Sequence, residues 1–393
     1  MQFVLADHSQ KKFRLVIVIE ALDRGGAEWH LLQTLPHLKS RDFDIEIFCL
    51  RHRGELADEM ERRGIVVHGY AASQNSLLIR LVQVAVRAFG LFFYLLRYRP
   101  HIVHFILPAA YIAGAPAAVL ARSRIRIMSR RSLNNYHSHM IGSKFIERQW
   151  HRRMSGVLGN SQSVIDQLKN EGIPETKLHL IYNGVDFSIF GHNVTRDDAR
   201  SRLGLSSEAL VFVIVANLIP YKGHADLLHA FALISDRMPQ NWVLLCAGRD
   251  DGIGSNLQDL VEKLGLTQRV HWLGSVKDVP SLLTAADVAL LASHEEGFSN
   301  AIIEYMATGL PAIVTNVGGN AEAIENGKSG FVVPARDPAA MADAILELSL
   351  DPDKRLRMGA YAQESARRQY SLESCVNSYL TFYKKILSDH GMG

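Results

Sequence analysis

Short apolar runs rich in β-branched residues recur along this chain in two series, and a helix-sized interval follows nearly every run. The first series lies at 13–20, 44–50, 65–70, 101–106, 124–130, 156–161 and 178–182. The second lies at 210–217, 242–248, 270–274, 287–293, 311–316 and 330–334. Strands that are apolar on both faces and alternate with helices are typical of parallel sheets covered by helices on both sides. The pattern therefore predicts two doubly wound α/β sheets.

A polar, irregular stretch at 186–207 separates the two series and is the predicted linker. The residues after 338 follow a helical pattern to about 388, without a further strand. We therefore predict two Rossmann-like domains, at 1–188 and 189–370. Ligands of open parallel sheets bind beyond the carboxyl ends of the strands, so the functional site is expected in a cleft that both domains face.

The composition of the 393 residues argues against several classes of protein. The net charge of +3 is too small to indicate a nucleic-acid partner by itself. The three cysteines have no metal-ligand spacing, which predicts a reduced compartment and no structural metal. Residues 1–12 lack the apolar run of a secretory signal, so a cytoplasmic protein is expected.

The segment 77–98 is strongly apolar but carries a narrow polar stripe at helical spacing. The stripe consists of Arg80, Gln83, Arg87, Tyr94 and Arg97, with Gly90 in the one missing step. An amphipathic helix packed on a sheet is the favoured interpretation, and a helix that touches a membrane surface is the alternative. These arginines and those at 122–131 would suit a peripheral protein on the inner face of a membrane, although such arginines more often form a solvated face.

The strongest functional signal is the segment SHEEGFSNAIIE at 293–304, which follows the apolar run ending at residue 292. Gly297 permits a tight turn, and Ser299 or Asn300 can cap the helix that follows. The exposed amides of that helix start favour an anion such as a pyrophosphate. Glu296 in the loop can reach a sugar, and Glu304, eight residues later, can accept hydrogen bonds from a ribose.

Two further loops follow strands of the same domain. The loop at 217–224 carries Lys222, where a cation can stabilise a departing diphosphate, and Arg249 after the next strand is a weaker candidate of this kind. The loop at 317–322 contains two glycines that let the backbone approach a ligand closely. Each loop alone is more often a simple turn or solvated surface, but the loops together favour a phosphate-binding site.

These residues, embedded in EGFSNAIIEYMATGLPAIVTNVGGNAE, resemble the retaining glycosyltransferases of family 4. The resemblance extends in family order over most of the chain, from GGAE at 25–28 through NGVD at 183–186 to KGH at 222–224. It implies the GT-B fold, with a C-terminal helix at about 371–390 that crosses back to the first domain. It also implies a UDP- or GDP-sugar donor, with no metal and no cofactor.

The resemblance further implies the roles of individual residues. Glu296 would contact the hydroxyls of the donor sugar, Glu304 the ribose and Lys222 the diphosphate. The donor site as a whole would comprise Gly25, Gly26, Asn217, Lys222, Arg249, Gly297, Phe298, Ser299, Asn300 and Glu304. Two positions depart from the family pattern. Asn217 stands where members often have an arginine, and Arg130 or Arg131 stands near the place of a histidine that faces the donor sugar.

The sequence thus predicts a transferase that moves a sugar from a nucleoside diphosphate to a hydroxyl of a glycan or lipid-linked acceptor, as in polysaccharide biosynthesis. The predicted catalytic residues are Glu296, Lys222 and Arg130, with no dedicated base. First-domain loops, including Arg24 and residues 134–137, would select the acceptor. A sugar-nucleotide epimerase and a non-catalytic sugar-nucleotide sensor remain alternatives. A glycosidase would need no phosphate loops, and a nicotinamide oxidoreductase would show a longer glycine motif.

Overall fold

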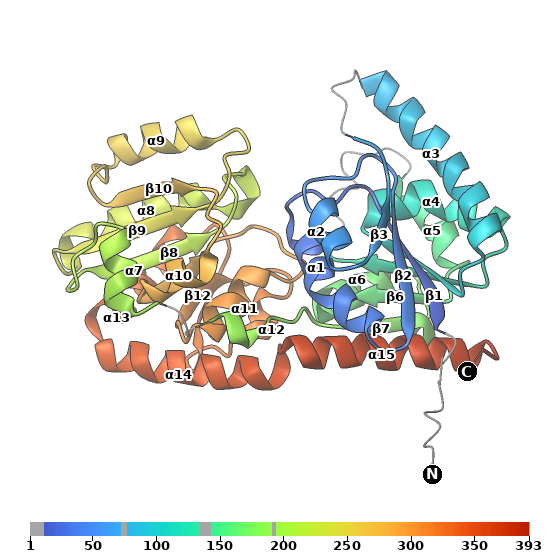
Figure 1. Cartoon of the computed structure of the whole chain (residues 1–393). Helices are drawn as coiled ribbons and strands as arrows, with labels where there is room; N and C mark the ends of the chain where they lie inside the picture. Colours follow the sequence, from blue (N-terminus) through green and yellow to red (C-terminus); the bar gives the residue numbers. More distant parts are fainter. Residues whose placement is uncertain (1–11, 72–76, 134–142, 191–193, 393) are drawn as a thin grey trace, which may run out of the picture. The chain divides into compact units, whose positions relative to one another are not determined.

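A computed structural model describes residues 12–71, 77–133, 143–190 and 194–392 (Figure 1). The chain divides into two compact units. Unit 1 comprises Met1–Asn160, Ile165–Ile181 and Cys375–Gly393, and unit 2 comprises Ser161–Val164 and Tyr182–Ser374.

Unit 1 is built on a seven-stranded parallel sheet with the order β3-β2-β1-β4-β5-β6-β7. Its strands are β1 (Phe13–Ile19), β2 (Phe43–Cys49), β3 (Val66–His68), β4 (Ile102–Ile106), β5 (Ile125–Arg130), β6 (Gly156–Gly159) and β7 (Leu178–Leu180). The connecting helices are α1 (Gly26–Lys39), α2 (Ala57–Arg62), α3 (Leu77–Tyr98), α4 (Pro108–Leu120), α5 (Ser143–His151) and α6 (Gln162–Asn170). All five residues of β4 are buried, as expected for a central strand covered on both faces.

Unit 2 is built on a six-stranded parallel sheet with the order β10-β9-β8-β11-β12-β13. Its strands are β8 (Leu210–Val215), β9 (Trp242–Ala247), β10 (Val270–Gly274), β11 (Val288–Leu291), β12 (Ala312–Thr315) and β13 (Gly330–Val333). Its helices are α7 (Arg196–Arg202), α8 (His224–Ile234), α9 (Gly254–Lys263), α10 (Val279–Thr284), α11 (Asn300–Ala307), α12 (Asn320–Ala323), α13 (Pro338–Leu350) and α14 (Pro352–Gln369). The two parallel α/β sheets confirm the predicted fold class.

The last helix, α15 (Leu372–Asp389), returns the chain to unit 1. The hydroxyl of Tyr383 lies 2.7 Å from Nδ1 of the buried His104 on β4. Lys384 forms an ion pair with Asp42 at 2.5 Å, beside the start of β2. The predicted crossing of the C-terminal helix back to the first domain is thus confirmed.

The predicted linker at 186–207 is not irregular throughout, because it contains helix α7. The backbone N–H of Asp198 donates to the hydroxyl of Thr195, which caps this helix. Arg200 is buried, and its guanidinium donates to the Asp287 carboxylate at 2.8 Å and to the Ala285 carbonyl at 3.0 Å. These bonds fix α7 to unit 2, so the prediction of an irregular linker was wrong over this helix.

Helix α3 lies at the outer edge of unit 1 and packs against α4 (Figure 1). Its residues Leu91 and Leu95 are buried, and its Tyr94 hydroxyl donates to Glu46 on β2 at 2.7 Å. Within the described part of the chain, no helix combines the length and the hydropathy needed to cross a bilayer.

Candidate functional site

The strand order of unit 2 places a topological switch point between β8 and β11. From β8 the chain first moves outward through β9 and β10, and it then returns to the other side of β8 with β11. Loops that leave the carboxyl ends of two such strands diverge, which opens a crevice where open α/β sheets bind ligands. The loop after β8 contains Lys222, and the loop after β11 contains Glu296.

Two glycines with positive φ hold three loops of this edge against one another. Gly223, with φ +70°, lies so near the end of β11 that a Cβ would come within 1.9 Å of the Ala292 carbonyl oxygen. Gly318, with φ +50°, follows β12, and a Cβ there would come within 1.8 Å of the Glu296 carbonyl oxygen. Any side chain at either position would separate the loops, so the backbone of the site depends on these glycines.

Lys222 and Glu296 meet directly at the switch point. Lys222 Nζ donates to Glu296 Oε1 at 2.5 Å, and both side chains are largely buried, with 17% and 11% exposed. The Ser293 hydroxyl donates to the same carboxylate oxygen at 2.7 Å. Lys222 Nζ also lies 5.4 Å from the ring centroid of Tyr221. The predicted lysine and glutamate are thus neighbours, and each holds the other in place.

Glu304 lies just over one turn into α11, and its side chain is half-buried. Burial raises the pKa of its carboxyl group from 4.5 to about 7. Among the described residues, none donates a hydrogen bond to this carboxylate. A desolvated carboxylate gains by accepting hydrogen bonds, which a vicinal diol can supply.

Asn217 and Arg249, which follow β8 and β9, form a polar cluster with Asp251. The Asn217 amide donates to Asp251 Oδ2 at 3.1 Å, and its oxygen accepts from the Arg249 backbone N–H at 3.2 Å. The Arg249 guanidinium donates twice to the same carboxylate, at 2.6 and 3.2 Å, and is half exposed. Asn217 therefore orients the loop that carries Arg249, although it supplies no positive charge itself.

The start of α11 presents backbone rather than side-chain donors. Ser299 is the N-cap residue, but its side chain does not cap the helix. The Asn300 side chain accepts a hydrogen bond from Asn183 at 2.5 Å. The Phe298 ring is buried and packs against Tyr182 and Tyr370, so its ring is part of the core of the unit. The start of α11 thus directly follows the turn at Gly297, after the carboxyl end of β11.

Gly25, Gly26 and Arg131 belong to unit 1. Gly25 is the N-cap residue of α1, and Gly26 is the first residue of the helix. Burial raises the pKa of Glu28, two residues further on, and the nearby positive charge of Arg131 opposes that rise. The Arg131 guanidinium also lies 3.5 Å from the Tyr379 hydroxyl. Arg131 is therefore close to the glycine loop after β1. Of Arg130 and Arg131, the two candidates for the place of the family histidine, this position suits Arg131.

Arg130 occupies a different environment. It is fully buried, and its guanidinium donates to both oxygens of Glu171 at 2.7 and 2.8 Å and to Glu147 at 2.5 Å. A fully buried arginine that is bound by two carboxylates is not presented to a donor. The expectation of a catalytic Arg130 is corrected accordingly, because β5 turns this side chain into the protein.

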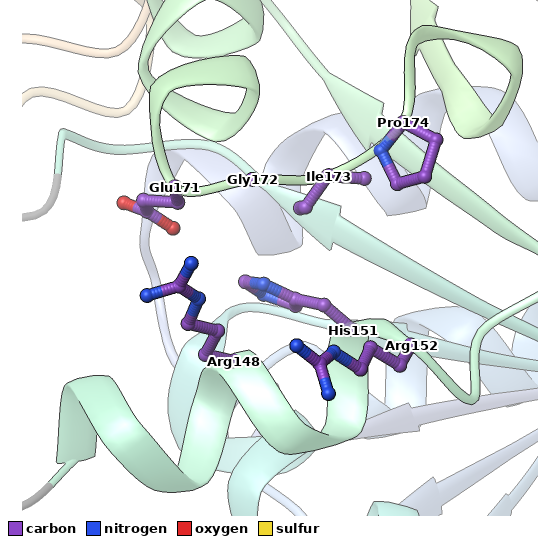
Figure 2. Close-up of a pocket in the computed structure, with 7 residues that line it drawn as sticks. All are labelled: Arg148, His151, Arg152, Glu171, Gly172, Ile173 and Pro174. Carbon is purple, nitrogen blue, oxygen red and sulfur yellow. The ribbon is translucent and has the colours of Figure 1, made fainter.

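The side chains around Arg130 include three that could serve as metal ligands. Glu147, His151 and Glu171 could each offer a ligand atom within 4.8 Å of the others. However, the Arg130 guanidinium already binds both carboxylates, which places a positive charge where a metal ion would have to sit. A pocket of about 40 Å³ beside this group is lined by Arg148, His151, Arg152 and residues 171–174 (Figure 2). A cavity needs about 10–15 Å³ on this measure to hold one water molecule, so the pocket has room for a few waters and is far too small for a nucleotide.

Some features could not be assigned from the sequence, and some lie outside the described residues. Ser293 was not singled out, although its place at the carboxyl end of β11, three residues before Glu296, was a usable signal. The His294 ring, 2.7 Å from the Asp226 carboxylate, had no such signal because Asp226 lies on α8, 68 residues earlier in the chain. Of the loop residues named for acceptor selection, those at 134–137 lie outside the described ranges, and Arg24 forms an ion pair with Glu55 at 3.0 Å.

Two family models match the chain in succession. The model described as Glycosyltransferase Family 4 matches residues 24–188, and the model described as Glycosyl transferases group 1 matches residues 195–365. The chain belongs to the family 4 glycosyltransferases. This glycosyltransferase is therefore an enzyme that transfers a glycosyl group, and the family motifs that contain Lys222 and Glu296 lie at the switch point described above.

Curated relatives of this glycosyltransferase come from several bacteria. N-acetyl-alpha-D-glucosaminyl L-malate synthase of Bacillus anthracis is 28% identical over 296 residues, which are 74% of this chain and 76% of that protein. D-inositol 3-phosphate glycosyltransferase of Corynebacterium urealyticum is 32% identical over 240 residues. That second match spans 58% of this chain and little more than half, 56%, of the relative.

Solved structures show the same fold. HepE from Anabaena in complex with UDP has a TM-score of 0.83 and 21% identity, over 95% of this chain and 100% of that one. Sucrose-phosphate synthase from Thermosynechococcus elongatus has a TM-score of 0.78 and 19% identity, over 96% and 100% of the two chains. These likenesses and the two sheets confirm the predicted GT-B fold.

Proposed function

We propose that this glycosyltransferase moves a sugar, with retention of anomeric configuration, from a nucleoside-diphosphate sugar to a hydroxyl group. The observation that supports this proposal most is the Lys222–Glu296 pair at the switch point of unit 2. A cation and a carboxylate held side by side can bind two neighbouring parts of one nucleotide sugar. Lys222 turns to the diphosphate, and Glu296 turns to the hydroxyls of the sugar.

The departing diphosphate is the group whose charge grows most during the reaction, so its stabilisation is the main task of the site. Lys222 supplies one positive charge, and the uncapped start of α11 supplies backbone N–H groups near Gly297. Arg249 supplies a second charge if the donor draws its guanidinium away from Asp251. The proposed reaction needs neither a metal nor a cofactor, because these groups carry the electrostatic stabilisation.

Glu304 anchors the nucleoside in this proposal. Its carboxylate lacks a donor among the described residues, and the ribose hydroxyls would supply two. UDP is the nucleotide that we favour, since HepE of the same fold was crystallised with UDP and with UDP-glucose. GDP remains the other member of the predicted donor class.

The acceptor is proposed to be a hydroxyl of a glycan or of a lipid-linked saccharide, and the reaction is proposed to take place in the cytoplasm. In unit 1, Arg131 and the loop of Gly25 and Gly26 are proposed as further substrate-binding residues. No protein base is assigned, and an oxygen of the leaving phosphate would take the proton of the acceptor hydroxyl.

A donor-hydrolysis assay with purified protein and a panel of UDP- and GDP-sugars tests the proposal. We expect slow hydrolysis of one donor, and proton NMR should show that the released sugar first appears with the anomeric configuration of the donor. Release of the opposite anomer would contradict retention. Conversion of the donor into an epimer without an acceptor would instead identify an epimerase, and binding without any turnover would identify a sensor.

A further inference from the structure

Helix α3 exposes a stripe of large apolar side chains. Val86, Phe89, Phe93 and Leu96 recur every three or four residues, and between 42% and 64% of each is accessible to solvent. Phe92 and Phe93 lie with ring centroids 5.2 Å apart, and Phe89 and Phe93 4.8 Å apart, so the aromatic rings form one cluster. A regular apolar stripe of this kind on the surface of a folded unit indicates a contact with something outside it.

Other described side chains of α3 are already engaged by unit 1, which fixes the direction of the stripe. Leu91 and Leu95 are buried. On one flank, the Arg87 guanidinium lies 4.2 Å from the ring centroid of Tyr70, and Tyr98 donates to Asp44 at 3.1 Å. The polar stripe expected to face solvent therefore lies along the side of the helix, and the face that points outward is apolar.

Basic side chains lie at the C-terminal end of this helix. β4 and β5 are adjacent and in register, with Ile102 opposite Ile125, so the residues just before each strand reach the same edge of the sheet. Those residues include the exposed arginines Arg97, Arg99, Arg122 and Arg124. Among the described residues, no carboxylate forms an ion pair with any of the four.

The surrounding sequence is free of acidic residues. Between Glu61 and Glu147 the chain has no aspartate or glutamate, whereas it has eleven arginines and one lysine. The net charge of the whole chain is only +3, so this excess of positive charge is local. A second copy of the chain would bring the same four arginines against this face, which disfavours self-association.

We propose that the exposed face of α3, with these four arginines, docks on a bilayer surface that contains anionic lipid. The helix lies in the plane of the surface, with Phe89, Phe93 and their apolar neighbours inserted at the boundary between headgroups and acyl chains. The arginines bind the lipid phosphates and add long-range attraction. This docking goes beyond the transferase reaction and does not depend on it, although it would bring a lipid-linked acceptor to the enzyme.

Co-sedimentation of the full chain with vesicles tests the docking. We expect binding to vesicles of phosphatidylcholine mixed with phosphatidylglycerol, and much weaker binding to phosphatidylcholine alone. The double substitution Phe89→Ser with Phe93→Ser should weaken binding roughly tenfold or more, because two apolar rings no longer enter the bilayer. Arg97→Gln with Arg99→Gln should weaken binding to the anionic vesicles by about fivefold per arginine.

The matched control is Leu233→Ser with Leu356→Ser, which removes two leucines of similar exposure from α8 and α14 of unit 2. This control should bind vesicles as the unaltered chain does. Circular dichroism should show that all variants are folded, because every substituted side chain is exposed.

Three results would overturn the proposal. They are failure of the unaltered chain to bind anionic vesicles, equal binding by the Phe89→Ser, Phe93→Ser variant, and a dimer in solution that this variant abolishes without any vesicle binding. A titration with UDP on the same preparations reports on the donor site separately, so failure of docking and failure of the proposed reaction are distinguishable.

Discussion

Replacement of Glu304 by glutamine separates the cost of burying this carboxyl group from its use in binding. Burial raises the pKa of Glu304 from 4.5 to about 7. At about 1.4 kcal/mol per pKa unit, this shift corresponds to about 3 kcal/mol. The protonated form is favoured in the folded state. Its contribution to stability is therefore fully present below the usual pKa of 4.5 and is lost as the pH rises through about 7.

Glu304→Gln keeps the shape of the side chain and removes the charge. Without nucleotide, we expect the variant to be more stable than the unaltered protein by up to about 3 kcal/mol at about pH 8, with the difference vanishing near pH 4. With UDP, the loss of a charged acceptor for the ribose should weaken binding by about ten- to a hundredfold.

Urea unfolding followed by hydrogen exchange of unit 2 peptides measures the first effect, and calorimetry measures the second. A variant that is less stable at every pH, or a stability difference that does not change with pH, would refute the burial of this charge. Unchanged UDP affinity would refute the contact with ribose. Glu262→Gln, on the exposed side of α9, is a matched control that should change neither quantity.

Three further predictions concern the remaining charged residues. Lys222→Ala should slow transfer by more than roughly tenfold while the protein stays folded; steady-state kinetics checks this against the surface control Lys328→Ala, and full activity would remove Lys222 from the mechanism. Glu296→Gln should lower kcat much more than it weakens UDP binding, and a change in nucleotide affinity alone would mean that its role is misassigned. Arg130→Met should lower the free energy of unfolding by about 3–5 kcal/mol, since it leaves Glu147 and Glu171 without their buried cation. Arg131→Ala should instead slow transfer with little effect on unfolding by urea. The reverse pattern would contradict the assignment of these two arginines.

The sheets could be predicted from the sequence because their strands are apolar on both faces, and each predicted strand matches an observed one within a few residues. Lys222 and Glu296 could be named as site residues because both follow strands that end at the same edge. Their direct hydrogen bond could not be foreseen, since it depends on side-chain conformation across two loops.

Other features depended on tertiary contacts that a linear pattern does not contain. The helix at Arg196–Arg202 was missed because its short polar sequence resembles a loop, although Thr195 followed by two aspartates was a capping signal. The direction of Arg130 depends on which side of β5 its carboxylate partners occupy. For α3, periodicity defined a polar stripe, but only the positions of Glu46 and Asp44 on β2 show that this stripe is a flank.

Calorimetric titration of the intact chain with UDP, GDP and ADP addresses the switch-point site of unit 2 most directly. We expect one site per chain that binds UDP or GDP, with affinity reduced in both Lys222→Ala and Glu304→Gln. An absence of heat with every nucleoside diphosphate and with the corresponding sugar nucleotides would contradict a donor site at the ends of β8 and β11.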